Sequence, residues 1–438
     1  MTTRVNKFNQ RSLVGILAGL FVLGALSPAG AVPQIESTYG GQSPWFQAEL
    51  NSMAASGAAS YRGGMSNILN PAGLAGAGAF RIDLGFAANH HEEDRFVPVF
   101  DTFDNAVTDM SIASNQNTWW NGGFALAAQL TDGSVPLNLG LSLADRYPFA
   151  YRFEEEIRDP NFGSSPRDQI IEERSYEVSG TLRNLSLGLA TEIADRIAVG
   201  VSVHAAFGNR DERWTVRDNA TDDANGDGSY DNADFWSLGG ANATFGIQAK
   251  VHERLTLGLA YETALSVEGD YEISTYSAGD EAPSSDMDFE SLKYPAYWRG
   301  GMAFYPRSDP KTVFTTDVVY SDWSKLEDSR WGDDKPFLQD VVDVRIGLQH
   351  TFYNNMNMRF GFRRYDSYAD DEGGNSVWSA GGGFPVLQGE LSFSLELNKL
   401  ITNDVPHIFD YPADYEVPET ARVDDRRFRF GIGWAREF

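Results

Sequence analysis

The sequence predicts an all-β protein, a transmembrane antiparallel β-barrel of about 14 strands. Three observations lead to this prediction. The chain ends in a strand of alternating apolar residues that finishes on Phe438, similar strands recur in pairs joined by short turns, and the connections alternate between short and long. A soluble all-β protein is the alternative, and it does not explain these features together.

The final strand carries the most specific pattern in the chain. Apolar residues share one of its faces and polar residues or glycines share the other, as expected where one face meets lipid and the other the lumen. A terminal phenylalanine resembles the signal that hands outer-membrane barrels to their assembly machinery, so that machinery is an expected partner. The lipid-facing set is Phe428, Phe430, Ile432, Trp434 and Phe438, and the lumen-facing set is Arg429, Gly431, Gly433 and Glu437.

The same alternation recurs upstream, for example at Leu185, Leu187 and Leu189 before a short turn. A closed barrel built from such strands satisfies every backbone hydrogen-bonding group in hydrocarbon. The predicted strands are centred near 79–90, 118–130, 136–147, 174–193, 197–216, 234–250, 255–272, 287–305, 312–323, 339–351, 356–367, 376–385, 390–401 and 427–438. The predicted long outer loops lie near 91–117, 148–173, 217–233, 273–286, 324–338, 368–375 and 402–426.

The N-terminus has the pattern of an export signal. Basic residues at positions 4, 7 and 11 precede an apolar run at 13–26 and small residues at 29–31. The apolar run is too short to span a bilayer as a helix. We therefore expect residues 1–31 to be a cleaved signal peptide and the mature chain to reach the outer membrane. A buried N-terminal helix is the alternative.

The composition restricts the partners of this 438-residue chain. Its formal charge of −27 makes nucleic acid and anionic lipid surfaces poor partners, and the lack of cysteine removes disulfides and thiolate chemistry. A mean hydropathy of −0.35 suits strands that alternate lipid-facing apolar and lumen-facing polar residues. Acidic residues gather in the predicted outer loops, where divalent cations could bridge them to lipopolysaccharide. The alternative is that they simply keep these loops solvated.

Residues 32–78, between the signal peptide and the first strand, are poor in alternation and rich in small residues. They contain a glycine- and alanine-rich stretch at 57–64 and then the run Asn70-Pro71-Ala72-Gly73-Leu74, and an aromatic–Asp–Trp–Ser strand end follows at 320–324. With these motifs, its length, its strand number and its C-terminus, the whole chain resembles the FadL-type outer-membrane transporters. It also resembles their PorV-like relatives.

This resemblance implies a plug and a substrate class. In the FadL-type family the N-terminal segment folds back as a hatch inside the barrel, so residues 32–78 are the expected hatch and 79–438 the barrel. Asn70, Pro71 and Ala72 are the expected hatch residues, and an ordinary turn before the first strand is the alternative. The resemblance also implies passive uptake of small hydrophobic compounds such as long-chain fatty acids or aromatic hydrocarbons. No motif locates the family's ligand pocket or the strand kink that opens it towards lipid.

The predicted lumen faces are polar, which the residue pattern alone does not reconcile with a hydrophobic tunnel. Such side chains could brace a plugged barrel or line an aqueous pore, so a general porin remains a rival function. A PorV-like docking partner for secreted proteins is a second rival. The polar lumen residues include Asp343, Arg345, Gln349, Arg359, Arg363, Ser392, Ser394 and Glu396.

Two predicted outer loops carry aromatic residues that could capture a hydrophobic ligand. They could equally pack loop against loop over the barrel mouth, and we favour that interpretation. The candidates are Phe96, Phe100 and Phe103 in the first loop, and Phe149, Tyr151 and Phe153 in the second.

A third predicted loop has the spacing of a calcium-binding loop. Oxygen-bearing residues fall at positions 1, 3, 5, 7, 9 and 12 of a twelve-residue segment, with glycine at position 6 for the sharp turn. No cofactor is required, and calcium in this outer loop competes with a solvated turn as the explanation. The candidate ligands are Asp223, Asn225, Asp227, Ser229, Asp231 and Asp234.

Other chemistry finds little support in the sequence. His90 and His91 could bind a metal, but adjacent residues of a strand point to opposite faces. None of the common catalytic motifs, such as Gly-x-Ser-x-Gly or His-Glu-x-x-His, is present. An enzyme whose site is assembled across strands is therefore a remote alternative, and we expect no catalysis.

Overall fold

The computed structural model of the chain describes residues 38–40, 46–100, 103, 105–133, 135–158, 170–193, 196–218, 229–276, 284–307, 310–331, 335–369, 374–409 and 420–438. The predicted signal peptide, residues 1–31, lies outside this range. Among the described residues, no helix is both long enough and apolar enough to cross a membrane.

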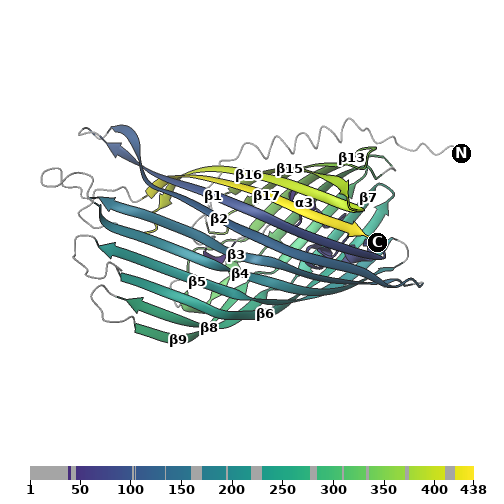
Figure 1. Cartoon of the computed structure of the whole chain (residues 1–438), viewed down its shortest axis with the longest axis horizontal. Coiled ribbons are helices and arrows are strands. Elements are labelled where there is room, and N and C mark those ends of the chain that lie inside the picture. Colours follow the sequence, from purple (N-terminus) through teal and green to yellow (C-terminus); the bar gives the residue numbers. More distant parts are fainter. Residues whose placement is uncertain are drawn as a thin grey trace.

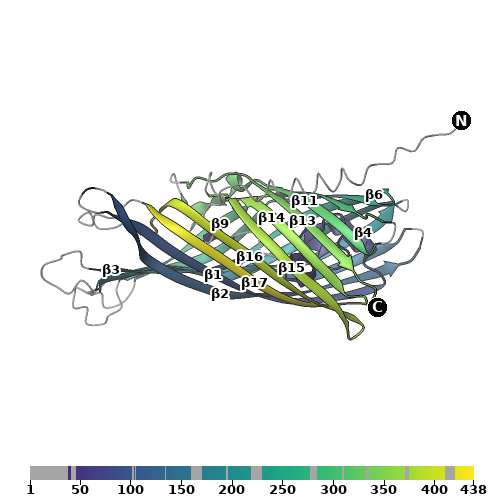
Figure 2. The same ribbon diagram turned by 90° about the horizontal axis from the view of Figure 1, so that it is seen from above.

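The strands form one antiparallel sheet that closes on itself, because the first strand pairs with the last along most of its length (Figures 1 and 2). The strands are β1 (Phe80–Phe100), β2 (Ala106–Thr131), β3 (Leu137–Arg158), β4 (Ile170–Ile193), β5 (Ile197–Asp218), β6 (Ser229–His252), β7 (Leu255–Glu262), β8 (Leu265–Tyr276), β9 (Ser284–Tyr294), β10 (Tyr297–Phe304), β11 (Thr312–Ser321), β12 (Glu327–Asp328), β13 (Val341–Thr351), β14 (Asn357–Asp366), β15 (Gly374–Val386), β16 (Gly389–Pro406) and β17 (Thr420–Glu437).

These segments make a 14-stranded barrel, as the sequence predicts. Within the described part of the chain, β7 and β8 are two parts of one strand, β9 and β10 are two parts of the next, and β12 is a two-residue bridge. Both ends of the barrel chain lie at the end with the short turns, on the right in Figure 1, and the long hairpins lie at the other. In outer-membrane barrels this asymmetry marks the periplasmic and the outer end, respectively.

A band of outward-facing apolar side chains surrounds the barrel nearer its periplasmic end. In β4 the band covers Leu185, Leu187 and Leu189, whose side chains are exposed as the alternation predicts. In β17 the predicted lipid face is exposed at Phe428, while Arg429 beside it is buried in the interior. This band is the part of the wall that hydrocarbon covers. Further members are Phe245, Ile247, Leu257, Leu259, Val318, Met358, Phe360, Phe430 and Ile432.

The prediction of long outer loops at 91–117 and 148–173 is wrong. β1 and β2 continue through the first of these ranges, and β3 and β4 continue through much of the second. Alternation persists there, but with apolar residues on the inside and polar residues on the outside, because these parts stand above the apolar band and meet water outside and other side chains inside. In β4, for example, Tyr176 is buried and Glu177 is exposed. The strands therefore project as a β-sheet collar beyond the membrane.

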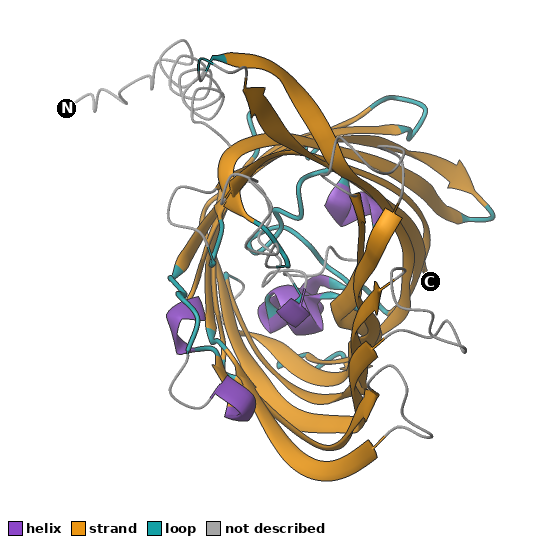
Figure 3. Ribbon diagram, turned by 90° about the vertical axis from the view of Figure 1, so that its left-hand side faces the viewer, coloured by secondary structure: helices purple, strands orange, loops and turns teal. Residues whose placement is uncertain are grey.

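The N-terminal residues 46–78 lie inside the barrel, where Figure 3 shows helical turns within the ring of strands. This part, called the N-terminal segment below, contains α3 (Ala48–Asn51), α4 (Ser66–Leu69) and the 3₁₀-helix η1 (Pro71–Gly76). η1 packs against β4, β5 and β6, and α3 packs against β15, β16 and β17. Two further 3₁₀ turns, η2 (Trp323–Lys325) and η3 (Ser329–Trp331), follow β11.

Candidate functional site: the lumen and the break between β2 and β3

Polar side chains of the barrel wall hold the N-terminal segment in place. The Asp317 carboxylate accepts hydrogen bonds from the backbone N–H groups of Gly57 and Ala58, at 2.8 and 2.9 Å. On another strand, Arg299 donates to the main-chain carbonyl of Ile68 at 3.1 Å. Buried backbone groups without secondary-structure partners must find others, and the polar lumen supplies them here. In this part of the barrel, the polar side chains of the lumen therefore bind the segment and do not line an open aqueous pore.

The run Asn70, Pro71 and Ala72 lies at the start of η1, completely inside the barrel. The Asn70 side-chain oxygen accepts a hydrogen bond from the backbone N–H of Ala72 at 3.1 Å and so caps the 3₁₀-helix, whose first residue is Pro71. The Asn70 amide nitrogen donates to the carbonyls of Ala58 and Ile247, at 2.8 and 3.1 Å. Asn70 therefore ties two parts of the N-terminal segment to β6.

The wall makes room for the segment with glycines. A Cβ atom placed at Gly200 would overlap the backbone of Pro71, and one at Gly258 would overlap the carbonyl of Ala58. Only glycine permits such a close approach between two backbones. The fit between the segment and these strands is therefore tight at the level of single atoms.

Elsewhere the polar lumen residues brace one another. Asp343 receives the guanidinium groups of Arg345 and Arg363, at 2.6 and 2.8 Å, and Arg359 pairs with Glu390 at 2.6 Å. Of the two alternatives for these residues, braces or the lining of an aqueous pore, the geometry favours braces.

The outer half of the lumen contains a large group of buried apolar side chains, which was not predicted from the sequence. Buried aromatic and aliphatic side chains from many strands meet there in one cluster, called the aromatic cluster. Its rings stack closely, with 4.1 Å between the ring centres of Tyr147 and Tyr294 and 4.0 Å between those of Trp323 and Tyr368. Its buried members include Tyr39, Tyr147, Phe149, Tyr151, Phe153, Tyr176, Val178, Leu182, Leu238, Leu265, Val267, Leu292, Tyr294, Trp323, Leu326, Val341 and Tyr368.

Tyr39, which precedes the N-terminal segment, belongs to this cluster. Its hydroxyl donates to Asp328 at 2.5 Å and accepts from the Trp331 indole at 2.9 Å, and the Arg210 guanidinium lies 5.4 Å from its ring centre. Burial, together with the Asp328 carboxylate beside it, raises the pKa of the Tyr39 hydroxyl. The hydroxyl therefore stays a hydrogen-bond donor, and the N-terminal chain reaches into both halves of the lumen.

The six aromatic capture candidates do not form one groove. Phe149, Tyr151 and Phe153 are buried in the aromatic cluster. Phe96 is half-buried beneath the guanidinium of Arg422, and Phe103 is 82 % exposed at the β1–β2 hairpin. The side chain of Phe100 lies outside the described residues. The structure thus brings together the second set, and it does so inside the lumen rather than on an outer loop.

A β-bulge at Arg146 turns this second set inward. Asp145 pairs with Arg183 and Tyr147 pairs with Leu182, so Arg146 is an extra residue in β3. Before the bulge the even-numbered residues of β3 are buried, and after it the odd-numbered residues are. One inserted residue shifts the alternation by one position and exchanges the two faces of a strand. Without it, the aromatic row from Tyr147 onward would point out of the barrel.

The wall of the barrel is broken next to this bulge. β2 and β3 pair from Thr131 and Leu137 up to Gly123 and Ala144, and no further rung joins them in the described residues. Asp145 takes the place of the next rung, since its carboxylate accepts the backbone N–H of Gly122 at 3.2 Å. Above this point β2 stays paired with β1, and β3 stays paired with β4.

Two asparagine side chains of β2 bridge the break. The Asn117 amide accepts from the backbone N–H of Arg152 at 2.7 Å and donates to its carbonyl at 3.1 Å. The Asn115 amide does the same with Glu154, at 2.8 and 3.4 Å. Each side chain thus stands in for the edge of a neighbouring strand. The break is closed at this height by amides rather than by a β-ladder.

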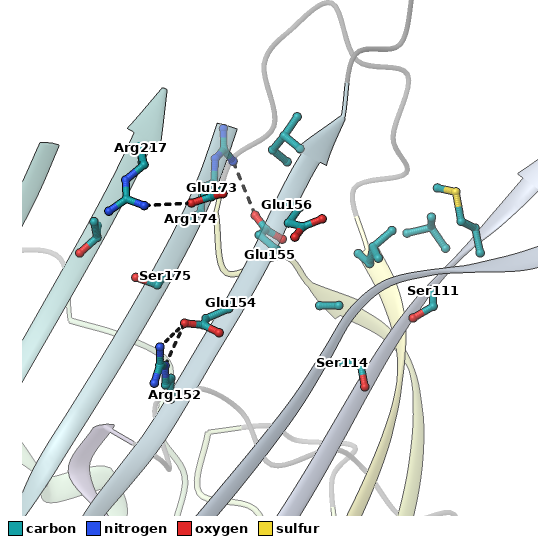
Figure 4. Close-up of a pocket in the computed structure, with 16 residues that line it drawn as sticks. Ser111, Ser114, Arg152, Glu154, Glu155, Glu156, Glu173, Arg174, Ser175 and Arg217 are labelled. Atoms are coloured by element: carbon teal, nitrogen blue, oxygen red, sulfur yellow. Dashed lines mark hydrogen bonds and ion pairs between the residues drawn. The ribbon is translucent and has the colours of Figure 1, made fainter. Parts of the chain in front are cut away.

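Above the asparagine bridges, β2 and β3 diverge around a cavity of about 840 Å³ (Figure 4). One wall is apolar, with Met110, Ile112 and Ala113 of β2 and Ile157 of β3. The other wall carries paired charges, namely Arg152 with Glu154, Arg174 with Glu155 and Arg217 with Glu173. The cavity therefore lies between the two strands beyond the point where the ladder and the bridges end.

The metal candidates stay untested. Asp223, Asn225 and Asp227 lie outside the described residues, and Ser229, Asp231 and Asp234 lie on β6, whose side chains are not described there. His90 contacts Thr118 and His91 contacts Asp425, on opposite faces of β1. Within the described ranges, no group of three or more His, Cys, Asp or Glu residues could hold a metal ion. Calcium binding by the 223–234 segment remains a prediction.

Arg146, Asn115 and Asn117 were not predicted from the sequence. A signal for the asparagines is present, since Asn115 and Asn117 repeat an amide at a strand period of two. The bulge has a weaker signal in the sequence. The leucines at 139–143 and the aromatic residues at 147–153 are all odd-numbered, so regular alternation would place both rows on the lipid-facing side. The charged residues Arg152 and Glu154, which alternate with the aromatic residues, suit a strand outside the membrane with its aromatic row turned inward.

Comparison with known proteins gives structural matches only. No protein-family model matches the chain, and no curated protein matches it in sequence. Among solved structures, a FadL homologue of Pseudomonas aeruginosa is similar with a TM-score of 0.65 and 14% identity, over 91% of this chain and 100% of that one. The toluene transporter TodX of P. putida is similar with a TM-score of 0.61 and 13% identity, over 94% and 99%. The toluene transporter TbuX of Ralstonia pickettii is similar with a TM-score of 0.55 and 14% identity, over 90% and 98%. The chain therefore has the fold of FadL-type barrels.

Proposed function

We propose that this protein is an outer-membrane channel of the FadL type for the passive uptake of small hydrophobic compounds, without covalent chemistry. The observation that carries the proposal is the aromatic cluster. It offers apolar surface inside a barrel whose lumen also contains many paired polar side chains. The similar solved structures are transporters and a FadL homologue, and two of them are toluene transporters. Aromatic hydrocarbons and long-chain fatty acids are accordingly the first compounds to test.

In this proposal the N-terminal segment acts as the hatch. It lies in the lumen below the aromatic cluster and is anchored by Asp317 and Arg299. A compound that enters the cluster competes with the ring of Tyr39 for contacts with the other aromatic side chains. Tyr39 belongs to the same N-terminal chain as the hatch. It then leaves through the break between β2 and β3, where side chains replace the ladder and less backbone hydrogen bonding must be disrupted.

The proposal is tested by uptake of radiolabelled toluene and of a radiolabelled long-chain fatty acid. The host is a Gram-negative strain that lacks its own channel for such compounds and expresses the full-length chain. We expect faster uptake of at least one compound than in cells carrying an empty vector. Equal rates for both compounds, with the folded barrel present in the outer membrane, would refute the proposed function.

Conductance in planar bilayers separates this function from a general porin. If the segment acts as the hatch, the intact barrel should show little ion conductance. Removal of residues 32–70 should raise the conductance. Large, stable conductance of the intact protein would instead favour a porin. Stable co-purification with a folded secreted protein would favour a docking partner.

Lipopolysaccharide and the barrel assembly machinery are proposed partners. The collar carries mixed charges on its outer surface, including the exposed pair of Arg422 with Asp109 and that of Arg426 with Asp424. We propose that such groups contact lipopolysaccharide phosphates through divalent cations. The C-terminal strand, with its alternating pattern and terminal Phe438, is the proposed recognition element for assembly.

A further inference from the structure

One carboxylate inside the barrel holds two arginines from different parts of the wall. Glu262, the last residue of β7, pairs with Arg146 of the β3 bulge at 2.9 Å and with Arg299 of β10 at 2.8 Å. All three side chains are at least 96% buried. Removing one partner of such a buried group leaves an uncompensated charge, so the three residues are expected to act as a unit.

The unit reaches the N-terminal segment through Arg299. One nitrogen of the Arg299 guanidinium donates to Glu262, and the other donates to the main-chain carbonyl of Ile68 in the last turn of α4. The planar guanidinium fixes the directions of these two hydrogen bonds relative to each other. Displacement of Ile68 therefore disturbs the contact between Arg299 and Glu262.

The unit reaches the break through Arg146. This residue is the extra residue of the bulge, it follows Asp145, and the β2–β3 ladder ends at Ala144. The Arg146 guanidinium lies 5.0 Å from the ring centres of both Tyr147 and Tyr297. Its inward position, held by Glu262, keeps the bulge in place and with it the inward aromatic row of β3.

We propose that Glu262 is a positioning residue that couples the seating of the N-terminal segment to the conformation of the β2–β3 break. The proposal rests on the proposed function in one respect, that the segment moves during transport. When Ile68 leaves Arg299, that arginine competes with Arg146 for the Glu262 carboxylate. The bulge then loses its inward anchor and the break widens. The coupling is reciprocal, so widening the break also loosens the segment.

The absence of cysteine allows a direct test with spin labels at introduced cysteine pairs. The first pair, at Gln116 of β2 and Arg152 of β3, faces outward on both sides of the break. The second pair, at Arg62 of the segment and Tyr353 in a periplasmic turn, reports the seating of the segment; both side chains are exposed. Distance distributions are measured by pulsed electron resonance on the full-length barrel, with no substrate present.

We expect Glu262→Gln to broaden both distributions and to add a longer component across the break. Glu396→Gln is the matched control, because Glu396 pairs with buried Arg429 at 3.4 Å between β16 and β17, away from the break. It should leave both distributions as in the parent. Unchanged distributions in Glu262→Gln, or the same change in both variants, would overturn the proposal.

A second variant tests the coupling by loosening the N-terminal segment. Asp317→Asn removes a charge that also acts on Arg299, but it weakens the seat at Gly57 and Ala58 and leaves in place every hydrogen bond and ion pair of Glu262. It should broaden the distribution across the break when Glu262 is present, and add nothing further in the Glu262→Gln background. Additive broadening would overturn the coupling. Only barrels that keep the faster gel migration of folded protein before heating are compared. These distances do not depend on transport, so a failed uptake assay and a failed coupling are distinguishable.

Discussion

Asn117 and Arg152 are joined as two strands of a sheet are joined, although no β-ladder runs between β2 and β3 at their height. The Asn117 side-chain amide takes both the N–H and the carbonyl of Arg152, at 2.7 and 3.1 Å. Asn115 repeats the arrangement with Glu154 two residues along. The barrel thus has a lateral joint made of side chains, which is weaker and more local than a backbone ladder.

Replacing Asn115 and Asn117 together with alanine should open this joint. Each amide contributes about 1 kcal/mol net, so loss of one such bond should speed amide exchange at Arg152 and Glu154 by a factor of about five. Hydrogen–deuterium exchange of β3 measures the effect. Gln116→Ala, at the exposed residue between them, is the control and should leave the exchange rates unchanged. Equal rates in the double variant and the parent would contradict the bridging role.

Deleting Arg146 should exchange the two faces of the outer part of β3. The alternation then continues without a shift, and Phe149 moves from the aromatic cluster to the outer surface. A cysteine at position 149 should therefore react with a water-soluble maleimide only in the deletion variant, and a cysteine at position 150 should react mainly in the parent. Arg146→Lys keeps both the residue count and the positive charge that faces Glu262, and it should keep the parent's labelling pattern, as judged in folded barrels. An unchanged pattern in the deletion variant would argue against the bulge as the cause.

Phe149→Ala should weaken both the barrel and its binding of a hydrophobic probe. Phe149 is fully buried in the aromatic cluster, and truncating such a ring costs about 3–5 kcal/mol. Binding of toluene to the detergent-solubilised barrel and its denaturant midpoint measure the two effects. Phe103→Ala is the comparison, because the Phe103 side chain is 82 % exposed. Should Phe103→Ala weaken binding and Phe149→Ala not, capture would occur at the hairpin instead of in the lumen.

Gly258→Val should displace the N-terminal segment. The new side chain overlaps the Ala58 carbonyl, and the segment cannot seat against β7 without a backbone shift. Ion conductance in planar bilayers should rise towards that of the barrel lacking residues 32–70. Gly239→Val serves as the control, because nothing lies within 4 Å of a Cβ atom at that position. Low conductance of folded Gly258→Val barrels would count against a tightly seated segment.

The membrane-spanning part of the barrel could be predicted because lipid imposes a simple rule on it. Leu185, Leu187 and Leu189 must face hydrocarbon, and the alternation they create is visible without any structure. The same rule located the last strand from Phe428 onward. Above the apolar band the rule no longer applies, since both faces can be polar or apolar there, and the strand extensions have the sequence pattern of loops.

The site was harder to predict, because it depends on contacts that are distant in sequence. Glu262 and Arg146 are 116 residues apart, and neither belongs to a recognisable motif. The bulge is a one-residue event that alternation can reveal only if the outer part of β3 is already known to be a strand. The Asn70-Pro71-Ala72 run, by contrast, is local, and its position in the lumen follows from a resemblance that the sequence itself displays.

The pairing of β1 with β17 has a consequence for how this protein is made. The strand that completes the ring follows all the other strands of the barrel in the sequence, and Phe438 donates its backbone N–H to the carbonyl of Phe80 at 2.8 Å. Until that strand arrives, the first strand carries a long row of unsatisfied hydrogen-bonding groups, which hydrocarbon does not tolerate. A chain interrupted anywhere before its end therefore has no stable place in the bilayer, and the cell must shelter the unfinished product or degrade it.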